Sequence, residues 1–168
     1  MPEPRHNKGY SSQVYCTPDN FLDAVRIKLC IRDFVVDLAA SEENAICPLF
    51  ITEADNSLIQ PWHILCGKKN NGIGWCNPPF ADIEPWVHHA YEEGQWQLGA
   101  ESALLLPAGV GANWWRDFVH QKAAVLFLNG RIKFVGAKDV YPKDCVLLRY
   151  GPSVQWGYDI WSWSRELL

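Results

Sequence analysis

Apolar residues along the chain follow two spacings, one typical of helices and one typical of strands. Positions three and four residues apart predict helices over residues 18–29, 83–93 and 112–121. Short apolar runs bounded by polar residues or glycine predict strands. The predicted strands are residues 34–36, 49–52, 73–76, 103–106, 125–128, 132–135 and 145–150. Strands that alternate with helices in this way indicate an α/β fold with a mixed sheet.

Capping residues mark where two of these helices begin. Thr17 and Pro18 are typical of an N-cap followed by proline at the first helical position. Asp82 is a similar start for the second helix, and Gly94 is expected just past its end.

Turn residues indicate how other elements are connected. The strand at 34–36 ends at Asp37, and Ser41 with two following acidic residues predicts a short, capped helical turn. Asn129-Gly130 lies between two apolar runs and predicts a hairpin that returns as residues 132–135.

Length and charge limit what the protein can be. The 168 residues, 48% of them hydrophobic, suit one domain over residues 13–168 after a flexible N-terminus at 1–12. A net charge of −4 argues against a histone-like coat on nucleic acid and against a polybasic membrane anchor. No apolar run approaches the roughly 18 residues of a spanning helix, so we expect a cytoplasmic protein without membrane contact.

Cysteine and tryptophan are the unusual counts. The six cysteines form no Cys-x-x-Cys pair, so we expect reduced, mostly buried thiols and no metal site. Nine tryptophans indicate core packing, although a groove that stacks bases also uses tryptophan. Trp75 is the one most expected to contact a ligand, because it lies beside the segment described next.

The segment Asn77-Pro78-Pro79-Phe80 is the strongest candidate for chemistry. It follows the predicted strand 73–76, and two prolines prevent the chain from continuing as a strand. It matches the (Asp/Asn/Ser)-Pro-Pro-(Tyr/Phe/Trp) signature of methyltransferases that modify amino groups conjugated to a ring. The Asn77 side-chain oxygen and the Pro78 carbonyl can accept the two hydrogens of such an amine, while Phe80 stacks on a base flipped out of its duplex.

The same four residues have a purely structural interpretation. In it they form a Pro-Pro turn, with Asn77 bonded to local backbone and Phe80 in the core. A four-residue pattern alone does not separate the two interpretations, so the flanking sequence has to be considered.

Six short motifs occur in a fixed order along residues 13–150. They are Tyr15-Cys-Thr17-Pro18, Asp37-Leu-Ala-Ala-Ser41-Glu-Glu-Asn44-Ala, Thr52-Glu-Ala-Asp55-Asn-Ser-Leu58, Trp75-Cys-Asn77-Pro-Pro-Phe80, Leu104-Leu-Leu-Pro107 with Trp114-Trp115, and Phe127-Leu-Asn-Gly130-Arg131-Ile-Lys133-Phe134. This ordered series resembles the phage-associated DNA N-6-adenine methyltransferase family. The resemblance implies a compact Rossmann-like fold, with a mixed, mostly parallel sheet covered by helices on both faces, and S-adenosylmethionine as methyl donor.

The resemblance also implies which residues hold the donor. Tyr15, Thr17 and Pro18 are expected near its methionine end, and Asp37 and Ala39 in the loop that follows the first strand. Thr17 and Pro18 are equally consistent with an ordinary helix start. Most such enzymes have Gly-x-Gly where this chain has Leu38-Ala39-Ala40, so its donor contacts differ from the common pattern.

Asp55 is the expected acidic residue for the donor's ribose or adenine. A surface Asp-Asn turn is a competing interpretation of the same residue.

Charge is distributed unevenly along the chain. Residues 116–149 hold seven Lys and Arg against three Asp, whereas the remainder holds eight basic and sixteen acidic residues. Within the basic part, Arg131, Lys133 and Lys138 are the expected DNA phosphate contacts. A lysine-rich hairpin that protects a sheet edge would have the same composition.

Together these features predict a methyltransferase acting on the N6 amine of adenine in double-stranded DNA. A phage enzyme of this kind is expected in the bacterial cytoplasm, where it would protect DNA from restriction. Cytosine N4 methylation, amine methylation of RNA or protein, and a non-catalytic nucleic-acid-binding module on the same fold are the alternatives.

Overall fold

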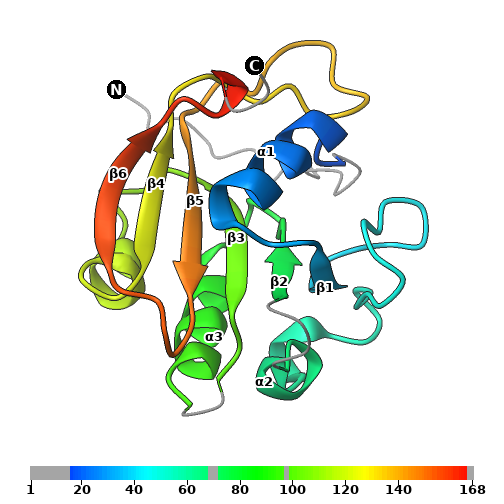
Figure 1. The fold of residues 1–168 in the computed structure, drawn as a ribbon, viewed down its shortest axis with the longest axis vertical. Coiled ribbons are helices and arrows are strands. Elements are labelled where there is room, and N and C mark those ends of the chain that lie inside the picture. The colour runs from blue at the N-terminus through cyan, green and yellow to red at the C-terminus, as the bar shows by residue number, and fades with distance from the viewer. Residues whose placement is uncertain (1–15, 68–71, 97–98, 166–168) are drawn as a thin grey trace, which may run out of the picture.

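A six-stranded sheet with helices on both faces forms the protein in the computed structural model, which describes residues 16–67, 72–96 and 99–165 (Figure 1). The expectations for residues 1–12 and for Tyr15 lie outside these ranges. The strands are β1 (Phe34–Asp37), β2 (Ile73–Cys76), β3 (Ser102–Pro107), β4 (Ala124–Leu128), β5 (Cys145–Tyr150) and β6 (Gly157–Trp161).

The sheet is mixed, as the sequence predicts. Its strand order is β1-β2-β3-β5-β4-β6. The β1/β2, β2/β3 and β4/β6 pairs are parallel, and β5 is antiparallel to both of its neighbours. Because β1, β2 and β3 run in one direction, the loops that leave their carboxyl ends gather at one edge of the sheet.

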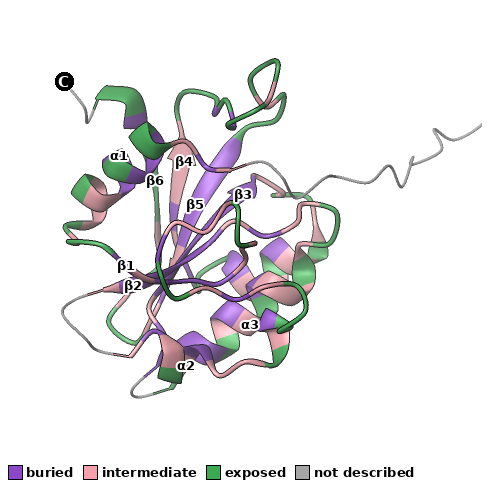
Figure 2. Cartoon of the chain, turned by 90° about the vertical axis from the view of Figure 1, so that its right-hand side faces the viewer, coloured by how far each residue is buried: buried purple, intermediate pink, exposed green. Residues whose placement is uncertain are grey.

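Helices cover the two faces and divide the core into two layers. The helix α1 (Asp19–Leu29) packs on one face, and α2 (Trp62–Leu65) and α3 (Glu84–Gly94) pack on the other (Figure 2). Alternation along β3 supplies both layers, since Ala103 and Leu105 face α1 while Leu104 and Leu106 face α3.

Two of the predicted strands are absent as strands. Residues 49–52 make only an isolated bridge, between Phe50 and Asp37. Residues 132–135 do not return as a hairpin from Asn129-Gly130, because both edges of β4 are taken by β5 and β6. The chain instead runs from Gly130 into a loop with one bridge, from Val135 to Cys16.

Helix starts and lengths also differ from the prediction. Helix α1 begins at Asp19, so Pro18 is the N-cap and Thr17 precedes it. Ile83, rather than Asp82, caps α3, and Gly94 is its last residue. The predicted helix at 112–121 is mainly a short π-helical segment, η2 (Trp115–Val119), and the chain after Ser41 forms a turn.

Strand β6 is an element that the sequence pattern did not reveal. It pairs with β4, and its Trp161 is 2% exposed and lies 5.9 Å from Phe21 of α1, measured between ring centroids. Its other residues are largely exposed, as expected for an edge strand, so its apolar periodicity is weak.

The cysteines are free thiols, as expected. Cys47, Cys66, Cys76 and Cys145 are buried. Burial raises the pKa of Cys47, Cys66 and Cys145 to about 12. No helix in the described part of the chain is long and apolar enough to span a membrane.

Candidate active site

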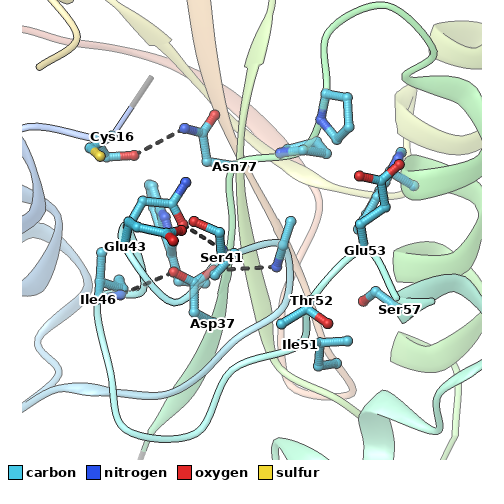
Figure 3. Close-up of a pocket in the computed structure, with 18 of the residues that line it drawn as sticks. Cys16, Asp37, Ser41, Glu43, Ile46, Ile51, Thr52, Glu53, Ser57 and Asn77 are labelled. Atoms are coloured by element: carbon cyan, nitrogen blue, oxygen red, sulfur yellow. Dashed lines mark hydrogen bonds between the residues drawn. The ribbon is translucent and has the colours of Figure 1, made fainter. Parts of the chain in front are cut away.

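A cavity of about 1000 Å³ lies at the carboxyl ends of β1 and β2. Ligands of open α/β sheets bind at this edge, because the loops that leave the strands diverge there. Figure 3 shows Asp37, Ser41 and Glu43 on one side of the cavity and Glu53 and Ser57 on the other.

Asp37, the last residue of β1, is a buried carboxylate in the cavity wall. Its side chain accepts hydrogen bonds from the backbone N–H groups of Ala39 and Ile46, at 3.3 and 3.2 Å. It is 3% exposed, and burial raises its pKa to about 6 although the two hydrogen bonds oppose the shift. A carboxylate desolvated in this way is well suited to a cationic ligand group.

The loop after Asp37 forms the adjacent wall without the expected glycines. None of residues 38–46 has a positive φ, so the backbone conformation does not require glycine and alanine fits at positions 39 and 40. Leu38 turns into the core, where it packs on Gly74 of β2. A Cβ built at Gly74 would lie 2.9 Å from Leu38 Cδ1 and 2.7 Å from Cys66 Sγ. The glycine thus makes room for Leu38 from the neighbouring strand.

Asn77 and both prolines lie at the carboxyl end of β2 and line the same cavity. The Asn77 amide nitrogen donates a hydrogen bond to Thr17 Oγ1 at 3.2 Å. Figure 3 shows this nitrogen turned toward the N-terminal segment at Cys16 and the amide oxygen turned away from it. Thr17 lines the cavity, whereas Pro18, the N-cap of α1, is not among the lining residues.

Phe80 belongs to a cluster of three aromatic rings beside Asn77. Its ring centroid lies 6.1 Å from that of Phe134 and 5.4 Å from that of Tyr141, and the latter two are 5.8 Å apart. All three side chains line the cavity. Phe134 and Tyr141 come from the loop between β4 and β5, so this loop closes one side of the cavity.

Asp55 lies outside the cavity lining, although its neighbours contribute to it. Its carboxylate accepts hydrogen bonds from the backbone N–H and the hydroxyl of Thr52, at 3.0 and 2.7 Å, and these bonds lower its pKa. These contacts match the surface turn that was the competing interpretation of Asp55 in the sequence. Glu53 and Ser57 line the cavity instead.

The expected DNA-contacting cations are exposed on the loop that carries Phe134 and Tyr141. Lys133 lies between the buried Ile132 and Phe134, so its side chain points outward. Lys138 is exposed on the same loop. Arg131 is 52% exposed and pairs with Asp144 at 3.6 Å.

The structure therefore brings together most of the residues singled out from the sequence. Cavity-lining residues to which the sequence assigned no role include Glu53, Ser57, Trp86, Phe134 and Tyr141. The sequence predicts a strand and a loop for the segment that holds Phe134 and Tyr141. Its one signal for a packed wall is the apolar-charged-apolar alternation at residues 132–134. Trp75 also lines the cavity, although at 1% exposure it is mainly a core residue.

Metal-ligating side chains do not gather in the described part of the chain. Across residues 16–67, 72–96 and 99–165, no three His, Cys, Asp or Glu side chains are placed to hold a metal ion together.

Comparison with known proteins points to one family. The sequence model of the family described as DNA N-6-adenine-methyltransferase (Dam) matches residues 6–145. A protein of Escherichia phage T1 described as a DNA N-6-adenine-methyltransferase is 30% identical over 93 residues, which cover 55% of this chain and 36% of the relative. The chain belongs to the DNA N-6-adenine-methyltransferase (Dam) family.

Proposed function

We propose that the protein transfers a methyl group from S-adenosylmethionine to the N6 amine of adenine in double-stranded DNA. The observation that carries the proposal is that Asn77-Pro78-Pro79-Phe80 and the buried carboxylate of Asp37 line one cavity in a chain of this family. The Asn77–Phe80 segment suits the amine that accepts the methyl group, and the Asp37 carboxylate suits a cationic methyl donor.

The residues present fit the donor. Its ammonium group would pair with Asp37, which is buried against the loop of Ala39 and Ile46 with backbone N–H groups as its hydrogen-bond partners. Glu53, across the cavity, replaces Asp55 as the acidic residue for the ribose hydroxyls. The doubly covered sheet with its ligand cavity at the carboxyl ends of β1 and β2 supports a compact Rossmann-like methyltransferase fold.

The bound donor supplies an electrophilic methyl group on a sulfonium centre. The chain's own task is to make a weakly nucleophilic amine attack it. The lone pair of an exocyclic amine is delocalised into the ring, and two acceptors on its hydrogens favour the pyramidal form in which the lone pair is available. We assign these acceptors to Asn77 Oδ1 and the Pro78 carbonyl, which the Pro-Pro turn holds rigidly. A strong general base is unnecessary, because the proton is acidic once the methyl group has been transferred.

The aromatic rings of Phe80, Phe134 and Tyr141 would hold the adenine ring. A base paired inside a duplex is out of reach of such a cavity, so the target nucleotide is flipped out and packs on these faces. The loop that supplies Phe134 and Tyr141 also presents Lys133 and Lys138 to solvent. Phosphate contacts and base contacts would therefore come from the same loop.

The biological setting follows from the comparison with the phage protein. Methylated adenine blocks many restriction endonucleases, so protection of phage DNA in the cytoplasm of a bacterial host is the role that we propose.

A methylation assay tests the proposed function. The purified protein is incubated with tritium-labelled S-adenosylmethionine and unmethylated bacterial DNA, and the nucleosides are separated by mass spectrometry. We expect label in N6-methyladenine. Asn77→Ala should lower kcat about 10²-fold or more, because it removes the amide oxygen that accepts a hydrogen bond from the target amine. N4-methylcytosine as the only product, or no modified base while the donor binds, would overturn it.

A further inference from the structure

We infer that Thr17 is a positioning residue, which holds the side-chain amide of Asn77 with its oxygen available to the target amine. The inference rests on the proposed amine methylation and assigns to Thr17 a role different from donor binding.

The contact that carries the inference joins two distant parts of the chain. Asn77 Nδ2 donates to Thr17 Oγ1 at 3.2 Å across sixty residues of sequence. Thr17 is 6% exposed, so water competes little for its hydroxyl. The backbone around it is fixed on both sides, since Val135 N–H donates to the Cys16 carbonyl and the Pro18 carbonyl accepts from the first turn of α1.

The chemistry of an amide explains why such a partner matters. A carboxylate has two oxygens, but an asparagine has one acceptor oxygen and an NH₂ group with two donors. The target amine carries two N–H groups of its own. If the Asn77 side chain rotated by half a turn, it would direct donors at donors. Thr17 gives the nitrogen an acceptor on the side away from the proposed amine position, which favours the productive orientation.

This role differs from donor binding in what it predicts. A residue that orients Asn77 affects the methyl-transfer step and leaves donor affinity nearly unchanged. A residue that touches the donor changes its dissociation constant. Thr17 lines the cavity, so both roles are sterically open and the measurement has to separate them.

The test compares Thr17→Val and Thr17→Ser with the unmodified enzyme. We measure kcat with tritium-labelled S-adenosylmethionine and unmethylated bacterial DNA, and donor affinity by calorimetry. Thr17→Val should lower kcat about tenfold, as expected for one lost hydrogen bond, while the donor Kd stays within about twofold. Thr17→Ser, which keeps the hydroxyl, should restore most of the rate.

A matched control is the hydroxyl of Ser162, which bonds to the side chain of Asn129 at 3.1 Å, outside the cavity lining. Ser162→Ala should leave kcat unchanged. A second arm repeats Thr17→Val in an Asn77→Asp background. A carboxylate presents an acceptor whichever way it is rotated. Thr17→Val should therefore lower kcat clearly less in the Asn77→Asp background than in the unmodified enzyme.

Several results would overturn the positioning role. Two of them concern Thr17→Val alone: an unchanged kcat, or a rise in donor Kd that matches the loss of rate. The other two are a Thr17→Ser enzyme as slow as Thr17→Val, and a loss of kcat on Thr17→Val that is the same with Asn and with Asp at position 77. An unmodified enzyme that binds donor and methylates no DNA would instead refute the proposed function itself. The two failures are therefore distinguishable.

Discussion

At the scale of single residues, the clearest physical signal is the burial of Asp37. Its carboxyl group is 3% exposed, and its pKa is raised from 3.8 to about 6 chiefly because water is excluded. A protein that keeps an acid in such a place gives up stability at neutral pH. The cost is understandable if the ionised form has a cation to bind.

Asp37 should make the stability of the ligand-free protein depend on pH. The folded state binds the Asp37 proton more tightly than the unfolded state, so this stabilisation is complete below about pH 4 and is lost as pH rises through about 6. The loss is up to about 3 kcal/mol. We expect Asp37→Asn, which stays neutral, to gain stability relative to the unmodified protein between pH 4 and 7, measured by urea denaturation. If the difference in unfolding free energy between Asp37→Asn and the unmodified protein stays constant across this range, the pKa of Asp37 is not raised.

Donor binding should show the opposite dependence on pH. A cationic donor needs the ionised carboxylate, so its Kd should rise as pH falls below about 6, about tenfold per pH unit at most. Calorimetric titration with S-adenosylmethionine from pH 5 to 8 measures this. Asp37→Asn should bind weakly at every pH. If the affinity of the unmodified protein does not vary over this range, Asp37 does not meet the donor's ammonium group.

At the scale of elements, the contact of β1 and β2 near the cavity depends on one glycine. Gly74 makes room for Leu38, and a Cβ there would lie 2.7 Å from Cys66 Sγ and 2.9 Å from Leu38 Cδ1. We expect Gly74→Ala to destabilise the fold by about 1–3 kcal/mol through overpacking. Thermal unfolding measures the loss, and Gly74→Ala should cost less in a Leu38→Ala background than in the unmodified protein, because the close contact with Leu38 Cδ1 is then removed. A single variant as stable as the unmodified protein would show that the strands relax freely.

The loop between β4 and β5 should be where DNA phosphates bind. Its exposed Lys133 lies between two buried residues, and the loop closes the cavity through Phe134 and Tyr141. Lys133→Ala should weaken DNA binding and reduce the slope of log K against log salt by about 1, since one phosphate contact is lost. Fluorescence anisotropy with duplex DNA measures both.

The exposed Arg32 provides the matched control for Lys133. It lies before the start of β1, at the end of the strand opposite the cavity. Arg32→Ala should leave the salt slope unchanged. Equal effects of the two substitutions would mean that DNA contacts are spread over the surface.

At the scale of the whole molecule, the C-terminal strand packs against the first helix through aromatic side chains. Trp161 of β6 and Trp163 of the short helix η3 (Trp163–Arg165) pack on Phe21 of α1, with ring centroids 5.9 and 5.1 Å from it. Trp161→Ala should cost about 3–5 kcal/mol in unfolding free energy, because a large buried side chain is removed. Exposed Trp156→Ala is the control and should change little. A small loss at position 161 would indicate that β6 is dispensable.

Local patterns determined most of the elements and the central motif of the site. The residues of β2 and the Pro-Pro turn after it were predictable, because prolines prevent the chain from continuing as a strand and the apolar run before them fits one. Asn77, Pro78, Pro79 and Phe80 were singled out as a local signature, and Asp37 through the resemblance to the family. All five line the cavity.

Tertiary packing decided what local patterns left open. Residues 132–135 have the composition of a strand, but β5 and β6 occupy both edges of β4, so the segment became a wall of the cavity. Asp55 and Glu53 are both acidic residues of one turn, and only the fold decides which of them lines the cavity. One hydrogen-bond partner of the Asn77 side chain, Thr17, is sixty residues away. Contacts of this kind depend on how strands are ordered in the sheet, which no short stretch of sequence encodes by itself.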